Sequence, residues 1–410
     1  MLRTLFPRYH PRYERSCCGE ELEAFGLWLM ASGYSRQNTC GHLRRLRRVF
    51  ERDGEAGSNT AYSDRRLKEL FEYQGVPDRQ AVGYQATRRA YRRFLAACGR
   101  LEVMPLNERQ QGIEEYGRFL REVRGFAPST TAQHVSTVTG FLDYALTPTD
   151  SLAALTAVHV EHYLSLKSAQ VTRQTLQHTV AHLRAFLAYA FDSRLIPTRL
   201  DTIDTPRTYR GEQPPRAMPW ELVQGLLRSI DRSGKAGWRD YTILHLMAYF
   251  GLRPSEIVAL EVGSVDFEAR TLRVQQRKTA SELILPLASP TLGVLRRYLH
   301  RGRRQDGHRE LFLRARRPSG ALKHTAVCDL FAKRTREFGI PPGRYSAYSL
   351  RHAFALRLLE RGVGVKAIGD LLGHRSLEST CVYLRLDIAA LRTVALPVPS
   401  LHGIQEASYG

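Results

Sequence analysis

The sequence predicts a mainly α-helical chain that ends in a mixed domain of helices and one small antiparallel sheet. Three observations lead to this prediction. Apolar residues recur with the helical period of about 3.6 residues through the first half of the chain. The pattern of that half occurs twice, at the scale of a whole four-helix unit. Beyond a proline-containing linker, two apolar runs typical of β-strands flank a polar turn.

The first half of the chain predicts two sets of four helices. The first set is expected at residues 21–31, 36–51, 62–73 and 79–97. The second set is expected at residues 111–124, 129–146, 156–167 and 171–191. An offset of 92 residues superposes residues of similar character, namely Gly33 on Gly125, Tyr34 on Phe126 and His42 on His134. We interpret the two sets as copies of one unit, and the alternative is the general likeness of amphipathic hairpins.

Residues 198–219 separate this helical half from the rest of the chain. They contain four prolines and no apolar period, which is typical of a linker. The expected organisation is therefore an N-terminal helical domain, a second four-helix domain, the linker, a mixed domain and a tail. Their expected bounds are 1–100, 105–197, 198–219, 220–395 and 396–410.

The mixed domain combines helices with a β-hairpin. Helices are expected at residues 220–230, 239–250, 290–301, 324–338, 349–361, 365–372 and 377–385. Residues 271–275 and 283–287 have the alternation and residue types of strands. They flank a polar turn that contains Arg277 and Lys278, so this segment is predicted to be an antiparallel hairpin.

The charge of the chain indicates a polyanionic partner. Lys and Arg number 61 against 40 Asp and Glu, a formal net charge of +21. Such an excess favours nucleic acid first and an acidic membrane surface second. Only seven of the basic residues are lysine, and arginine's planar fork suits phosphate. Arg44, Arg45, Arg47 and Arg48 are candidate DNA contacts, with a solvated helix face as the alternative.

Several classes of protein are excluded by composition. With 43% hydrophobic residues the chain has enough apolar material for packed cores, which excludes global disorder. No apolar run approaches the roughly 18 residues of a membrane span, and the first residues lack the apolar stretch of a signal peptide. The six cysteines form no C-x-x-C pair, so neither a metal site nor a disulfide framework is expected. We expect reduced thiols in a cytoplasm and no cofactor.

Three motifs and two single residues in the mixed domain resemble the tyrosine recombinase, or phage-integrase, family. Gly-Leu-Arg-Pro-Ser-Glu at 251–256, Tyr-Ser-Leu-Arg-His at 348–352 and Leu-Leu-Gly-His at 371–374 resemble its three boxes. Tyr383 follows the third box by nine positions, the spacing typical of the nucleophile, and Lys278 lies on the hairpin that carries the family's catalytic lysine. The resemblance spans about residues 220–395, and the helices of 110–191 are similar to the family's SAM-like, DNA-binding core-binding domain.

The resemblance implies a role for each residue of these motifs. Tyr383 is the expected nucleophile and Lys278 the expected general acid, while Arg253, Arg351 and His374 are expected to hold the phosphate. Glu256 is expected to orient Arg253, and His352 either supports the site or belongs to the core. These residue types suit transesterification at a phosphodiester, because arginine keeps its charge and lysine can release a proton. Arg277 is a further candidate DNA contact.

One position departs from the family's pattern. A histidine usually stands three residues before the second arginine, and this chain has Tyr348 there. A phenol can donate a hydrogen bond to a phosphate oxygen, but at neutral pH it is uncharged and a poor base. We therefore expect Tyr348 to be a variant donor or a residue that orients the nucleophile, and the departure hints at reduced activity.

The resemblance implies a site-specific recombinase that cleaves and rejoins double-stranded DNA through a 3′-phosphotyrosine intermediate, for movement of a mobile element. It further implies four protomers on two duplexes, with sister recombinases as candidate partners, in a bacterial cytoplasm close to the nucleoid. A short helix from Asp387 is expected to dock on a neighbouring subunit or, alternatively, within its own. A catalytically silent DNA-binding relative and a DNA relaxase of type IB topoisomerase character remain the alternatives.

Overall fold

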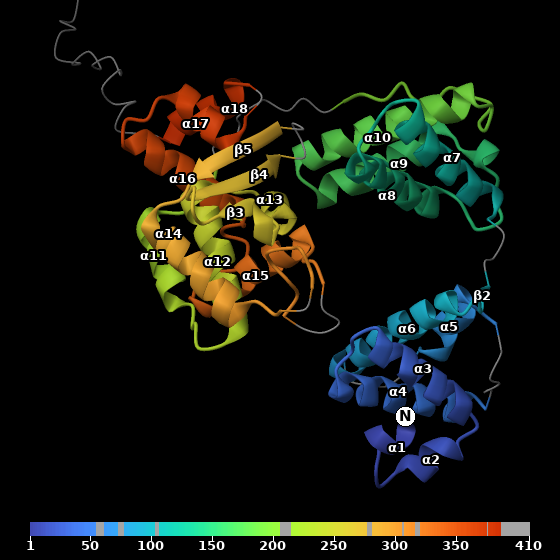
Figure 1. Ribbon diagram of the computed structural model, residues 1–410. Helices are drawn as coiled ribbons and strands as arrows, with labels where there is room; N and C mark the ends of the chain where they lie inside the picture. The colour runs from blue at the N-terminus through green and yellow to red at the C-terminus, as the bar shows by residue number, and fades with distance from the viewer. Residues whose placement is uncertain are drawn as a thin grey trace, which may run out of the picture. The chain divides into compact units, whose positions relative to one another are not determined.

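The computed structural model describes residues 1–54, 61–72, 78–102, 106–205, 215–276, 281–305, 307–315, 320–374 and 376–386. It confirms a mainly helical chain with one small antiparallel sheet (Figure 1). The chain divides into two compact units, residues 1–58, 75–87 and 213–410 in one and residues 59–74 and 88–212 in the other. Among the described residues, none of the helices has the length and apolar character that a membrane crossing requires.

The N-terminal part of the chain is helical apart from two very short strands. Its helices are α1 Leu2–Leu5, α2 His10–Glu14, α3 Gly19–Ala31, α4 Arg36–Asp53, α5 Asp64–Leu70 and α6 Asp78–Ala97. The strands β1 Tyr62–Ser63 and β2 Leu101–Glu102 pair in parallel. Helices α3 to α6 confirm the four predicted ones, whereas α1 and α2 are additions. They are four and five residues long, too short to show a helical period.

The four clustered arginines of α4 have different surroundings. Arg47 is buried, with Nη1 2.9 Å from Glu51 Oε1 and its guanidinium over the Tyr13 ring of α2. Its prediction as a DNA contact is therefore corrected, because α4 turns this position inward beside the buried Leu43 and Leu46. The remaining three are at least partly accessible, namely Arg44, Arg45 and Arg48.

The second four-helix set follows the predicted order closely. Its elements are α7 Glu108–Glu122, α8 Pro128–Ala145, η1 Leu152–Ala154, α9 Ala157–Gln170 and α10 Arg173–Asp192. Asn107 starts α7 by accepting a hydrogen bond from the Gln110 backbone N–H, while the Gln110 side chain accepts from the Asn107 N–H. Fully buried aromatic side chains from three helices form its core, namely Tyr116, Phe141 and Phe186.

Corresponding residues of the two helical sets have matching backbone and ring geometry. Gly33 and Gly125 end equivalent turns with φ of 78° and 65°. The ring of Tyr34 lies 5.5 Å from that of His42, and the ring of Phe126 lies 5.4 Å from that of His134. At the ends of α6 and α10 the corresponding residues are Gly99 and Arg194, an offset of 95 residues. Both have positive φ, 68° at Gly99 and 59° at Arg194. These likenesses support the interpretation of a duplicated unit.

The C-terminal part contains the remaining helices and the sheet. Its helices are α11 Trp220–Ser229, α12 Lys235–Phe250, α13 Pro254–Ala259, α14 Ser289–Arg297, α15 His324–Glu337, α16 Tyr348–Glu360, α17 Val365–Leu372 and α18 Glu378–Cys381. Three short turns accompany them, η2 Val262–Ser264, η3 Tyr298–Gly302 and η4 Val382–Leu386. The sheet has the order β3 Val265–Asp266, β4 Thr271–Gln276 and β5 Ser281–Pro286, and both pairs are antiparallel. The predicted hairpin is thus confirmed.

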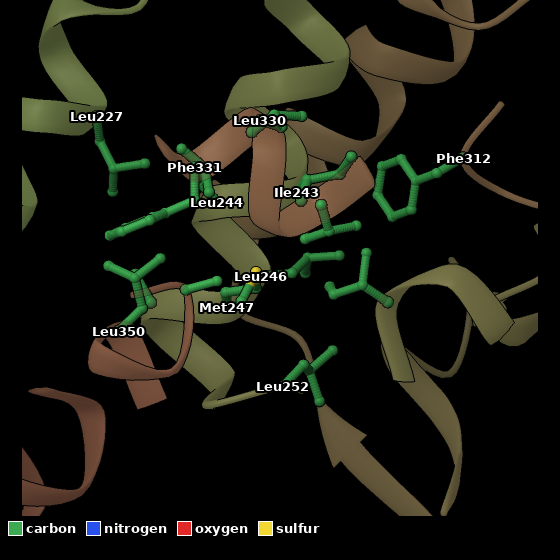
Figure 2. Packing of buried hydrophobic residues seen from close by; sticks show 14 of the residues in the cluster. Leu227, Ile243, Leu244, Leu246, Met247, Leu252, Phe312, Leu330, Phe331 and Leu350 are labelled. Carbon is green, nitrogen blue, oxygen red and sulfur yellow. The ribbon is translucent and has the colours of Figure 1, made fainter. Parts of the chain in front are cut away.

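Helix α12 is the centre of this part. Its apolar side chains are completely buried over successive turns, namely Ile243, Leu244, Leu246, Met247 and Ala248. They pack against Leu330 and Phe331 of α15 and Leu350 of α16 (Figure 2). Burying each of the larger side chains stabilises the folded chain by about 1.5–3 kcal/mol, so α12 is firmly packed in this part of the protein. The chain leaves α12 directly into the first motif, and Arg351 follows Leu350 on α16.

The last described segment differs from the prediction. A single helix was expected at 377–385, but α18 lasts for four residues and then tightens into the 3₁₀ turn η4. Tightening of this kind is common where an α-helix ends. It turns Tyr383 toward Ala355, Ile368 and Leu372, with which it forms a small apolar cluster. The expected helix from Asp387 and the tail 396–410 lie outside the described residues.

Candidate active site

The first motif begins where α12 ends, at Gly251. This residue has φ of 63°, a left-handed conformation that L side chains avoid, and it redirects the chain toward Arg253. A Cβ at this position would lie 2.6 Å from the Phe354 ring and 2.8 Å from a methyl carbon of Leu372. Glycine is therefore required twice, by the turn and by the close approach of α16 and α17.

Arg253 precedes α13, and Glu256 in the first turn of that helix holds it. Glu256 Oε1 accepts from Arg253 Nη1 at 2.6 Å, and its Oε2 accepts from the Arg253 backbone N–H at 2.8 Å. Pro254 occupies the first helical position, where a missing N–H costs nothing. The buried carboxylate thus fixes the direction of the guanidinium, as the motif predicts for this pair.

Arg351 on α16 connects the first and third motifs. Its Nη1 donates to the Gly251 carbonyl at 2.7 Å, and its Nη2 donates to the Leu372 carbonyl at 2.6 Å. The side chain is buried, with Glu256 Oε2 3.9 Å from Nη1. Burial and then the charge of Arg253 lower the Arg351 pKa to about 10, so it stays protonated at neutral pH.

His374 follows Gly373, which ends α17 with φ of 61°. Its Nδ1 lies 2.7 Å from the hydroxyl of Thr380, a buried residue of α18. The hydrogen bond occupies one ring nitrogen and leaves Nε2 for a ligand. Burial, followed by the charges of Arg351 and Arg253, lowers the His374 pKa to about 4, so the imidazole is neutral at pH 7.

Tyr383 lies among these groups. Its side chain is only 3% exposed, and its hydroxyl is 3.1 Å from His352 Nδ1. The His374 ring stacks beside it with the centroids 6.5 Å apart. Burial raises the Tyr383 pKa, while the positive charges of Arg351 and Arg253 act in the opposite direction. The hydroxyl is therefore within electrostatic reach of both guanidiniums.

Tyr348 is the first residue of α16 and is 45% exposed. Its hydroxyl is close enough to Arg351 to act in the direction that raises the pKa of that guanidinium. Tyr348 therefore lies near Arg351. Among the described residues, however, the partner of the Tyr383 hydroxyl is His352 and not Tyr348. The residue that contacts the Tyr383 hydroxyl is therefore His352, four positions after Tyr348 on α16.

Arg277 and Lys278 lie outside the described residues, but the strands that flank them are described. Gln276 ends β4 and pairs with Ser281 at the start of β5. Gln276 is buried against the third motif, because a Cβ on Gly373 would overlap its amide group. The end of β4 therefore lies next to the third motif.

Sequence analysis did not identify Thr380 or Gln276 as parts of this region. Thr380 could have been found, because it stands one helical turn before Tyr383, where its side chain lies on the same face. Gln276 carried no signal beyond its place at the end of a strand. Within the described residues, no three His, Cys, Asp or Glu side chains converge in a way that could hold a metal ion.

The chain matches known families over most of this architecture. Residues 218–389 match the Phage integrase family, and residues 113–193 match the Phage integrase N-terminal SAM-like domain. The Sinorhizobium fredii protein y4rA, named as an integrase/recombinase, is 30% identical over 293 residues, 71% of each chain. The tyrosine recombinase of Pseudothermotoga lettingae is 27% identical over 281 residues, 67% of this chain and 93% of that protein.

Solved structures share the fold. The XerH recombinase bound to a palindromic difH substrate in a post-cleavage complex matches with a TM-score of 0.55 and 17% identity, over 80% of this chain and 92% of that one. A lambda integrase dimer bound to a COC′ core site matches with a TM-score of 0.51 and 18% identity, over 67% of this chain and 94% of that one.

The fold and the family matches together define an enzyme that cleaves and rejoins DNA. The chain belongs to the phage integrase family of tyrosine recombinases. It is a tyrosine-type site-specific recombinase.

Proposed function

We propose that Tyr383 attacks the scissile phosphate, forms a 3′-phosphotyrosyl bond and releases a 5′-hydroxyl, which a partner strand's hydroxyl replaces during rejoining. The observation that supports this assignment best is the position of the Tyr383 hydroxyl, buried beside two imidazoles and within electrostatic reach of two guanidiniums. An unassisted tyrosine has a pKa of about 10 and is a weak nucleophile, so it needs such surroundings.

The two arginines support a phosphate as the natural occupant. Each guanidinium keeps its charge, and the charge of Arg253 helps to lower the Arg351 pKa, which means that the cations repel one another. Glu256 offsets only part of this repulsion. A phosphodiester between Arg253, Arg351 and His374 Nε2 would relieve the remainder. Stabilisation of this kind is the main source of catalysis in phosphoryl transfer.

Two further roles are proposed, one for Lys278 and one for Tyr348. Lys278 is proposed as the acid that protonates the departing 5′-oxygen, a contribution worth about 10²–10⁴ in rate. Tyr348 is proposed as a hydrogen-bond donor to a phosphate oxygen, and its exposure near Arg351 supports this role. The role of Lys278 follows from its place in the family's motif.

The helical domains are proposed to hold the DNA. We assign residues 1–100 and 105–197 to two SAM-like units, residues 198–219 to a linker and residues 220–395 to the catalytic domain. The matching geometry of the two helical sets supports the first assignment. Arg44, Arg45, Arg48 and Arg277 remain proposed DNA contacts. Their binding should weaken steeply with added salt.

The assembly is proposed to contain four protomers on two duplexes, with sister recombinases as further partners. The proposed setting is a bacterial cytoplasm near the nucleoid, and the proposed task is movement of a mobile element. Likeness to the named integrase/recombinase of Sinorhizobium fredii supports this task. Analytical ultracentrifugation of the chain with its recovered DNA site would test the assembly, because a complex that stops at one protomer per duplex contradicts it.

The chemistry is tested with DNA that traps the intermediate. A pool of duplexes, each nicked near a block of randomised bases, is incubated with the full chain, and covalent adducts are isolated on a denaturing gel. We expect an adduct with the wild-type chain and none with Tyr383→Phe, which keeps the ring and loses only the hydroxyl. An adduct that persists in Tyr383→Phe would overturn the assignment. DNA binding without any adduct would favour a catalytically silent relative, and site-independent relaxation of supercoiled plasmid would favour a type IB relaxase.

A further inference from the structure

His352 is the described side chain that contacts the nucleophile's hydroxyl. It follows Arg351 on α16, and its Nδ1 lies 3.1 Å from the Tyr383 hydroxyl. The two rings are tilted with their centroids 5.7 Å apart, so the contact is made by the ring nitrogen and not by stacking. A hydrogen bond of this length is suitable for direct proton transfer.

The second imidazole beside Tyr383 is arranged differently. The His374 ring is nearly parallel to the Tyr383 ring, with an interplanar angle of 13°. Its Nδ1 is already engaged by the Thr380 hydroxyl at 2.7 Å. His374 therefore stacks on the nucleophile, whereas His352 points a nitrogen at the reacting oxygen.

The protonation states favour His352 as an acceptor. Burial, together with the charge of Arg351, lowers the pKa of His352, so the ring is neutral at pH 7. Burial raises the pKa of Tyr383, so its hydroxyl keeps its proton in the absence of a base. A neutral imidazole next to a protonated phenol accepts the hydrogen bond, which leaves Nε2 of His352 as the protonated nitrogen.

We propose that His352 is the catalytic base of this enzyme. Its Nδ1 takes the hydroxyl proton of Tyr383 while the phenolic oxygen forms a bond to phosphorus. The bond from phosphorus to the 5′-oxygen breaks, and that oxygen takes a proton from the proposed acid, Lys278. In rejoining, the incoming 5′-oxygen forms a bond to phosphorus while the bond from phosphorus to the Tyr383 oxygen breaks. The proton of the 5′-hydroxyl passes to Lys278, and Tyr383 recovers its proton from His352. The inference rests on the function proposed above.

The charged and titratable groups around His352 determine how stable its imidazolium form is. Arg351 lies next to it on α16, His374 faces it from the turn after α17, and Tyr383 faces it from η4. Arg253 acts on the same cluster from the start of α13. A bound phosphodiester would add a negative charge to this cationic group, which favours the imidazolium at the moment it forms. Position 348 is then not needed as a base.

The experiment uses the full chain and a DNA site recovered from the trapping pool described above. The site is prepared with an ordinary phosphate and with a 5′-bridging phosphorothiolate, whose thiolate leaving group needs no acid. His352→Asn is the test variant, because its amide oxygen can accept a hydrogen bond where Nδ1 does but cannot take a proton. Lys278→Ala serves as the comparison for the acid. His245→Gln, at a buried histidine of α12 that pairs with Thr291, controls for loss of a core imidazole.

We expect His352→Asn to slow adduct formation by about 10²–10³ with either DNA, since proton removal is needed in both. Lys278→Ala should be slow on the phosphate and restored on the phosphorothiolate. The wild-type rate on the phosphorothiolate should rise with pH and level off above the pKa of His352. The rate of His352→Asn should continue to rise, because it depends on ionisation of Tyr383 itself.

Two results would overturn the inference while the proposed function stands. One is that His352→Asn forms the adduct at the wild-type rate at every pH. The other is that the 5′-bridging phosphorothiolate restores the rate of this variant, which would make His352 an acid and not a base. If His352→Asn does not fold, the wild-type profile alone decides, because a rate that climbs to pH 10 without levelling off rejects a base of low pKa. A wild-type chain that forms no adduct with any member of the pool rejects the proposed function, and the inference with it.

Discussion

The two helical sets of the N-terminal half join their second and fourth helices at equivalent positions with different side chains. In the first set, Thr87 of α6 accepts from Arg45 Nε at 2.8 Å and contacts His42 Nδ1 at 2.9 Å. In the second set, the equivalent residue of α10 is His182. Its Nδ1 is 3.0 Å from the Thr137 hydroxyl, and its ring lies 4.0 Å from that of His134.

This difference shows that similar pairs of helices can be held together by groups that differ in their response to pH. The first joint uses an arginine, whose charge does not change at any working pH. The contact in the second set brings two imidazoles together, and it is stable while both rings are neutral, because two protonated rings repel each other. At the same offset of 92 residues, Arg44 and Arg48 of α4 correspond to the uncharged Ser136 and Gly140 of α8. Helix α4 therefore carries more positive charge than α8.

The largest effect is expected from Thr87→Val. This change keeps the shape of the side chain but leaves Arg45 Nε and His42 Nδ1 without their partner inside the bundle. An unsatisfied buried group costs about 1–3 kcal/mol, and of these two residues only His42 is buried, so we expect a loss of about 1–3 kcal/mol in the stability of α4 and α6. Hydrogen exchange of these two helices measures it. Thr137→Val removes the half-buried hydroxyl that contacts His182 in the second set, and it should cost less because water can replace this hydroxyl. Equal losses would show that the two contacts do not differ.

The second prediction concerns pH. Burial, and then the neighbouring histidines His134 and His178, lower the His182 pKa to about 4, below the unfolded value of about 6.5. A depressed histidine pKa means that the unfolded chain binds the proton first. The stability of α8 and α10 is therefore complete above about pH 6.5 and decreases as the pH falls toward 4. His182→Thr, which copies Thr87, should weaken this acid sensitivity. Hydrogen exchange corrected for the intrinsic rate at each pH measures it, and an unchanged acid response in the variant would contradict the explanation.

The smallest effect is expected at the helix ends. Gly99 and Arg194 occupy equivalent positions with positive φ, which costs a non-glycine residue about 1 kcal/mol. Gly99→Ala should therefore destabilise the end of α6, although a Cβ there would meet no other atom within 4 Å. Arg194→Gly should stabilise the end of α10 by a similar amount. Changes of the same sign at both sites, measured by urea titration, would show that backbone strain is not the cause.

Much of the fold was predictable because long helices leave a periodic signal. Helices α3, α4 and α7 to α10 were found within a few residues of their ends. Helices α1, α2 and α13 were missed, since segments of four to six residues complete too few turns for a pattern. Arg47 was assigned to the surface because a run of arginines does not by itself show which of them the helix turns inward.

The site was predictable in its residues but not in its connections. Arg253, Arg351, His374 and Tyr383 come together as the motif implies. The sequence could not show that Arg351 is tied to two backbone carbonyls, because a carbonyl has no residue type. Nor could the sequence decide whether His352 supports the site or belongs to the core, because that depends on the distance from its Nδ1 to the Tyr383 hydroxyl.

The double tie of Arg351 to the Gly251 and Leu372 carbonyls has a practical consequence. A lysine has no planar guanidinium and could not donate to both oxygens. Replacing Arg351 would therefore remove a hydrogen bond from the turn at Gly251, from the end of α17, or from both. An inert decoy of this enzyme, one that occupies its DNA site and blocks the active copies, should accordingly be built by altering the phenol and not the guanidinium.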